Sequence, residues 1–175
     1  MSALAPLKLT LYEPETNEVH GDYICNFVPL RYLKLAIRLS KSLININADA
    51  LTGLITDLFG NKFSADDVRR YSEESDRILL LQAIITRARI IMSKRSENKS
   101  ENMETQIDDG LEYDLQDVDW IIDLEISLVN AFNWSLRDLD EMYIETLFPF
   151  ISRFTGMNTK TAVNTLKHCD EVPGW

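Results

Sequence analysis

Residues 29–43 read PLRYLKLAIRLSKSL, and this stretch indicates the fold class most clearly. Its apolar residues recur at helical spacing on two adjoining sides, and they are Leu30, Leu33, Leu35, Ile37, Leu39 and Leu43. The basic residues on the remaining side are Arg31, Lys34, Arg38 and Lys41. Such a pattern predicts an amphipathic helix with a wide apolar face. Pro29 suits its first turn, where a missing N–H would be unpaired anyway.

The residues before this helix have the two-residue period of a strand. In LKLTLY (7–12) the leucines occupy one face, and Lys8 and Thr10 occupy the other. PETNE (14–18) has turn chemistry, and VHGDYICNF (19–27) is a second strand-like run. We therefore expect a β-hairpin over residues 6–28.

The residues after it predict three more helices. Asn47 is a suitable cap for a helix over 48–59, and Gly60 follows at the position that favours a left-handed residue. A capping box at Ser64–Asp67 opens a short helix to about Tyr71. A fourth helix, about 74–93, is apolar on more than one side, so we expect it to lie centrally.

Residues 94–116 are polar and predict a linker. Beyond it, Asp117 can cap a helix with a broad apolar face over about 118–132. Ser135 can cap a helix continuing from Leu136 towards Phe148, which Pro149 should stop or kink. A weaker helix is expected at about 159–168. The fold class is therefore mainly α with a small N-terminal β-hairpin (α+β), divided into a module at 1–93, the linker at 94–116 and an acidic helical module at 117–175.

The net charge of −10 is unevenly distributed. The first 95 residues have 13 basic and 11 acidic side chains, whereas residues 96–175 have 5 and 17, a net charge of −12. This acidic part would repel nucleic-acid phosphates and anionic lipids. No run approaches the roughly 18–20 apolar residues of a membrane span. The N-terminus has no signal-peptide pattern, and Cys25 and Cys169 are expected to be free thiols. These features predict a cytosolic protein with neither nucleic acid nor membrane as a partner.

The sequence offers little for catalysis. It has no phosphate-binding glycine loop, nucleophile elbow or HExxH motif, and its histidines, His20 and His168, are far apart. The acidic residues that could serve as acid/base groups or Mg²⁺ ligands are Asp117, Asp119, Asp123, Asp138, Asp140, Glu141 and Glu145. Solvated helix faces or the rim of a docking surface explain them better. We expect no enzyme activity, no cofactor and no metal.

The C-terminal module has many apolar side chains for its size. They can form its own core, or some of them can lie on an exposed face that docks a partner, as aromatic residues ringed by charge commonly do. The candidate partner-binding residues are Trp134, Leu136, Leu139, Tyr143, Leu147 and Phe148.

Four segments together resemble the tail assembly chaperones of long-tailed bacteriophages, in particular the shorter, G-type protein of phages of Gram-positive hosts. They are KLTLYEPETNEVHGDY (8–23), FVPLRYLKLAIRLSKSL (27–43), LTGLITDLFGNKFSADDV (51–68) and LLQAIITRAR (80–89). FNWSLRDLDEMYIETLFPFISRF (132–154) resembles the T-type extension of the longer form of such chaperones. The matching positions are Phe132, Trp134, Ser135, Leu136, Leu139, Asp140, Glu141, Ile144 and Leu147.

The resemblance implies a non-enzymatic function in the host cytoplasm, with the protein absent from the mature virion. Members of this family cover the aggregation-prone tape measure protein, and their extension recruits subunits of the major tail tube protein. Self-association is also implied. The alternative is a helical regulatory adaptor whose basic helix, 30–43, binds nucleic acid or an anionic surface.

Overall fold

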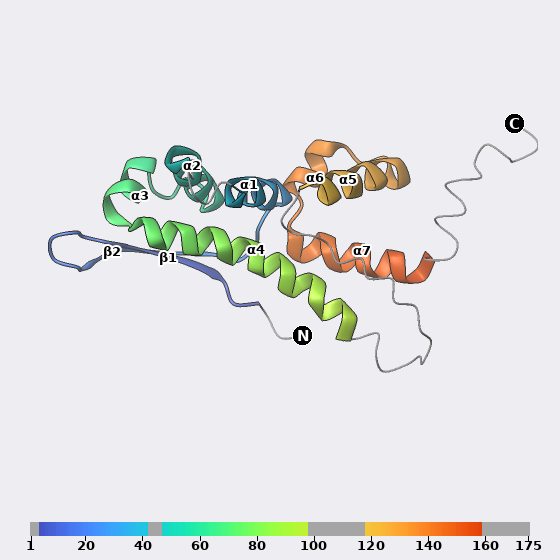
Figure 1. Cartoon of the computed structure of the whole chain (residues 1–175), viewed down its shortest axis with the longest axis horizontal. Helices are drawn as coiled ribbons and strands as arrows, with labels where there is room; N and C mark the ends of the chain where they lie inside the picture. The colour runs from blue at the N-terminus through green and yellow to red at the C-terminus, as the bar shows by residue number, and fades with distance from the viewer. Residues whose placement is uncertain (1–3, 42–46, 98–117, 159–175) are drawn as a thin grey trace, which may run out of the picture.

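The computed structural model describes residues 4–41, 47–97 and 118–158 (Figure 1). The described chain is mostly helical with one small antiparallel hairpin, which confirms the predicted fold class. Its elements are β1 (Leu7–Tyr12), β2 (Val19–Cys25), α1 (Leu30–Ser40), α2 (Ala48–Leu58), α3 (Ala65–Tyr71), α4 (Glu74–Glu97), α5 (Asp119–Phe132), α6 (Leu136–Glu141) and α7 (Ile144–Asn158).

Strand β1 of the hairpin has the predicted alternation of buried and less buried residues, whereas Val19 and Phe27 of the second run are exposed. Leu9 pairs with Tyr23, and the inward leucines of β1 are buried against the helices. On the outer face, the Asp22 carboxylate accepts a hydrogen bond from the Thr10 hydroxyl at 2.9 Å. It also forms an ion pair with Lys8 at 2.9 Å. Because the side-chain period of a strand is two, this burial pattern fixes the register of the hairpin.

Three predicted helix boundaries are confirmed. The Asn47 side chain accepts the backbone amides of Asp49 and Ala50 at 3.1 Å, and Gly60 ends α2 with a left-handed φ of 70°. At the start of α3, Ser64 and Asp67 form the reciprocal capping box. These bonds satisfy amides that the first helical turn leaves without partners.

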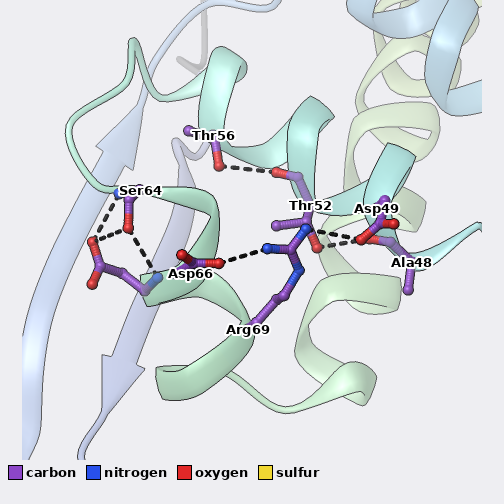
Figure 2. A network of polar contacts seen from close by, with 8 residues as sticks. Ala48, Asp49, Thr52, Thr56, Ser64, Asp66 and Arg69 are labelled. Atoms are coloured by element: carbon purple, nitrogen blue, oxygen red, sulfur yellow. Dashed lines mark hydrogen bonds and ion pairs between the residues drawn. The ribbon is translucent and has the colours of Figure 1, made fainter.

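Ion pairs on the surface connect α2 and α3 (Figure 2). The Arg69 guanidinium contacts Asp66 at 2.7 Å on its own helix and Asp49 at 2.8 Å on α2. Nearby, the hydroxyls of Thr52 and Thr56 donate to carbonyls one turn earlier in α2, which allows both side chains to be buried. These contacts are therefore part of the structural framework and not of a candidate functional site.

Helix α4 occupies the central position that its sequence predicts. It runs along the length of the molecule, next to β1 and α1 at one end and α7 at the other (Figure 1). Leu81, Ile84 and Ala88 are fully buried along it. The helix continues through residues 94–97, which the sequence analysis assigned to the linker.

The C-terminal helices begin close to their predicted positions. Val118 occupies the cap position of α5, and Asn133 ends this helix with a left-handed φ of 54°. Ser135 caps α6 by accepting the Asp138 amide at 3.1 Å, as predicted. The expected cap at Asp117 and the expected helix over 159–168 lie outside the described residues.

One expectation about residues 136–150 is wrong, and one of the two outcomes expected at Pro149 does not occur. The single helix from Leu136 to Phe148 is broken, because Met142 has an extended ψ of 139° and Tyr143 forms a β-bridge with Pro29. Of the stop or kink expected at Pro149, the stop does not occur, since α7 continues through this residue to Asn158. Proline removes one helical hydrogen bond, but the neighbouring apolar side chains on α7 are buried, and this burial favours continuation.

The two predicted modules share one hydrophobic core. We call residues 4–97 the body and residues 118–158 the C-terminal segment. A single cluster of buried side chains includes residues of both, and α6 and α7 pack on α1 and α4 respectively.

Candidate functional site

The body and the C-terminal segment meet in a polar contact that we call the seam. Leu30 donates its backbone N–H to the Met142 carbonyl at 2.8 Å, and Ile144 donates to the Val28 carbonyl at 2.9 Å. Leu30 begins α1 and Ile144 begins α7, so each amide belongs to a first turn that has no intrahelical partner for it. Each helix start is thus completed by the other part of the chain.

Arg87 and Glu145 form the buried centre of the seam. Their side chains are only 7% and 11% exposed, and the Arg87 Nε donates to Glu145. The two other guanidinium nitrogens of Arg87 donate to the carbonyls of Ala5 and Asn26, each at 2.5 Å. Glu145 also accepts the Val28 amide at 3.1 Å. Desolvated charges of this kind need both the opposite charge and hydrogen bonds, and here they have both.

A second group of ion pairs joins α1 to α5 and α6. Lys34 pairs with Glu125 at 2.7 Å and also with Asp140, and Arg31 pairs with Glu141. Burial lowers the pKa of Lys34, but its hydrogen bonds to Asp140 and Glu125 outweigh burial and raise the pKa above its ordinary value of 10.5. The ammonium is therefore firmly protonated at neutral pH.

These pairs bear on the alternative prediction that the basic helix binds nucleic acid or an anionic surface. Arg31 and Lys34 are two of the four basic residues proposed for that role, and both are neutralised by carboxylates of the same chain. The contrasting charges of the two halves of the sequence are thus used in part within the molecule. This arrangement argues against the adaptor alternative.

The six predicted docking residues do not form one exposed face. Leu139, Leu147 and Phe148 are 0%, 2% and 6% exposed, so they are core residues, and their assignment to a docking face is corrected. They are buried because α6 and α7 pack on α1 and α4. Leu136 and Tyr143 are about half exposed, and Trp134 is intermediate.

The exposed aromatic residue Tyr143 lies at the edge of the seam. Its ring is 5.3 Å from that of Phe27, which is also about half exposed. These rings and Pro29 help to line a shallow hollow of about 330 Å³ to which both parts of the chain contribute. Trp134 lies elsewhere, stacked on Phe132 at 5.0 Å.

Sequence reasoning missed two apolar side chains on α5. Ile122 and Ile126 lie one turn apart and are 39% and 51% exposed, with the exposed Asp123 between them in sequence. The available signal was the width of the apolar face of this helix, which exceeds what one contact can bury. The position of each residue along the helix did not show which part of that apolar face would remain exposed to solvent.

The acidic residues do not assemble into a metal site in the part of the chain that the structure describes. Asp140, Glu141 and Glu145 are engaged by basic side chains, and Asp138 belongs to the cap of α6. Among the described helices, none has the length and apolarity to cross a membrane.

Comparison with known proteins gives no relative: no family model, no curated protein and no solved structure matches this chain.

Proposed function

We propose that this chain is a non-enzymatic tail assembly chaperone, which covers a tape measure protein and recruits tail tube subunits in the host cytoplasm. The proposal starts from the resemblance of residues 7–91 and 132–154 to that family. It includes self-association of the chaperone along its long partner and absence of the protein from the mature virion.

One structural observation carries the recruiting part of the proposal. The C-terminal segment keeps Ile126 and Leu136 more than half exposed, although many of its other large apolar side chains enter the shared core. Exposed acidic residues are close to both in sequence, with Asp123 three residues before Ile126 and Asp138 two residues after Leu136. Apolar anchors with a charged surround are typical of protein-binding surfaces. A tube subunit with apolar side chains and basic neighbours would be complementary to these positions.

The body has exposed apolar residues that suit a different partner. Ile24 and Phe27 are 49% and 54% exposed at the end of the hairpin, and Leu79 is 60% exposed on α4. An aggregation-prone helical protein needs its apolar stripes covered, and scattered apolar residues on many copies of a small body can provide this cover. The proposed tape measure contact is therefore assigned to the body.

Co-expression of the tagged full chain with the tape measure and tube proteins of the same genome tests the proposal. We expect the wild type to retain both partners. The variant Ile126→Glu/Leu136→Glu should lose the tube protein but retain the tape measure protein, because both changes lie on exposed positions of the C-terminal segment.

The matched control is Leu79→Glu, an equally polar change at an exposed position of the body. It should keep the tube protein bound. Retention of neither partner by the wild-type chain would refute the proposed function.

A further inference from the structure

We propose that the body has a binding surface for the C-terminal segment of a second copy of this chain, so that copies can exchange these segments and associate. In the structure the surface is occupied by the segment of the same chain. The inference goes beyond the proposed function, since it concerns which surface joins one copy to another. It rests on the composition of the seam and on the length of the connecting chain.

The body surface has a specific charge pattern. Arg31 and Lys34 lie one turn apart on α1, and Arg87 lies on α4. Each of the three contacts a carboxylate of the C-terminal segment: Glu141 for Arg31, Glu125 and Asp140 for Lys34, and Glu145 for Arg87. The surface is therefore built to hold an acidic helical segment.

The buried position of Arg87 limits which segment can bind to this surface of the body. If the segment leaves, Arg87 keeps only the carbonyls of Ala5 and Asn26, and its charge loses the carboxylate that compensates it. A replacement must bring a carboxylate to the same place and also supply the backbone groups that pair with Val28 and Leu30. The same segment of another copy satisfies all of these requirements.

The connection between the two parts permits exchange. The described body ends at residue 97 and the segment begins at residue 118, so residues 98–117 join them. A chain of this length reaches at most roughly 65–70 Å when fully extended, which is ample to span two neighbouring copies. A connection of this length allows the segment to dock on its own body or on the body of a second copy.

Docking within one chain should dominate in dilute solution. A tether of this kind gives the segment an effective concentration of roughly millimolar near its own body. Exchange becomes competitive when copies are held close together, or when the contact within each chain is made unfavourable. The second condition can be produced by mutation, and it provides the test.

The test uses two full-length variants with opposite charge reversals. In Arg31→Glu/Lys34→Glu the body repels the acidic segment of its own chain. In Glu125→Lys/Glu141→Lys the segment repels its own basic body. When the two are mixed, each segment finds a complementary surface on the other chain, as in a designed heterodimer.

We expect the equimolar mixture to form a one-to-one heterodimer in light scattering after size exclusion. Its dissociation constant should be at least tenfold lower than that for self-association of either variant. Raising the salt concentration to about 1 M, where the Debye length is about 3 Å, should weaken the heterodimer, because the recognition is ionic.

A chain with all four substitutions is the folding control, since it restores opposite charges within one molecule. It should regain stability relative to both parents and stay monomeric in dilute solution. If it regains stability but the mixture does not associate, docking is confined to one chain and the proposal is refuted. If it does not regain stability, or if each variant self-associates as strongly as the mixture, the charge pairs do not determine recognition and the proposal also fails.

Discussion

Replacing Glu145 by glutamine should destabilise the protein strongly, because it removes a buried charge without removing volume. Arg87 is 7% exposed and would keep its positive charge with two carbonyls but no carboxylate. Breaking a buried ion pair from one side costs about 3–5 kcal/mol of unfolding free energy. The loss is large compared with the roughly 5–15 kcal/mol that stabilises an ordinary domain.

Urea unfolding monitored by circular dichroism measures this loss. With a urea dependence of about 2 kcal/mol per molar, the midpoint should fall by roughly 1.5–2.5 M. The matched control is Glu141→Gln, which breaks the exposed pair with Arg31 and should cost less than about 1 kcal/mol. The single variant Arg87→Met and the double variant Arg87→Met/Glu145→Gln complete a double-mutant cycle. The double variant should lose less stability than the sum of the two single variants.

The reasoning would be refuted by a Glu145→Gln variant no less stable than Glu141→Gln. It would also be refuted if the double variant lost the full sum of the two single losses, because the two charges would then not be coupled. In either case the seam would be held by its apolar contacts, and the central position of Arg87 would have no energetic role.

Three further predictions concern the scaffold. Ser64→Ala should lower the free energy of unfolding by about 1 kcal/mol, measured by urea unfolding. Asp67→Asn should remove the part of the stability contributed by this capping box that depends on acidic pH. The bonds from Ser64 lower the pKa of Asp67 below 3.8, so its contribution to stability is present above pH 3.8 and is lost as the pH falls through the lower folded value. Burial raises the pKa of the Cys25 thiol above 9.0. In a Cys169→Ser variant, alkylation of Cys25 at pH 9.0 should therefore be much slower in the folded protein than in urea, and equal rates would contradict this prediction. Leu139→Ala should lower the free energy of unfolding by about 2–5 kcal/mol in the same assay, because Leu139 is fully buried. A loss no larger than that caused by the same change at an exposed leucine would show that α6 is not part of the core.

The candidate site could be predicted only in part. Sequence reasoning found Leu136 and Tyr143, which remain about half exposed, but it grouped them with Leu139, Leu147 and Phe148, which are buried. All five are apolar residues in a helical pattern, and this pattern is the same for an inward and an outward position. The distinction depends on which neighbouring helix covers each side.

The sequence by itself determined the local features of the fold. Side-chain alternation placed the hairpin, and Ser64, Ser135 and Gly60 marked helix boundaries, because caps and turns involve groups only a few residues apart. The tertiary structure alone decided the break at Met142 and the pairing of Arg87 with Glu145. The bond from the Val28 amide to Glu145 joins residues 117 positions apart. Such contacts form only when α1, α4 and α7 pack together, since shared burial of apolar surface, rather than a local pattern, brings these charges and helix starts into contact.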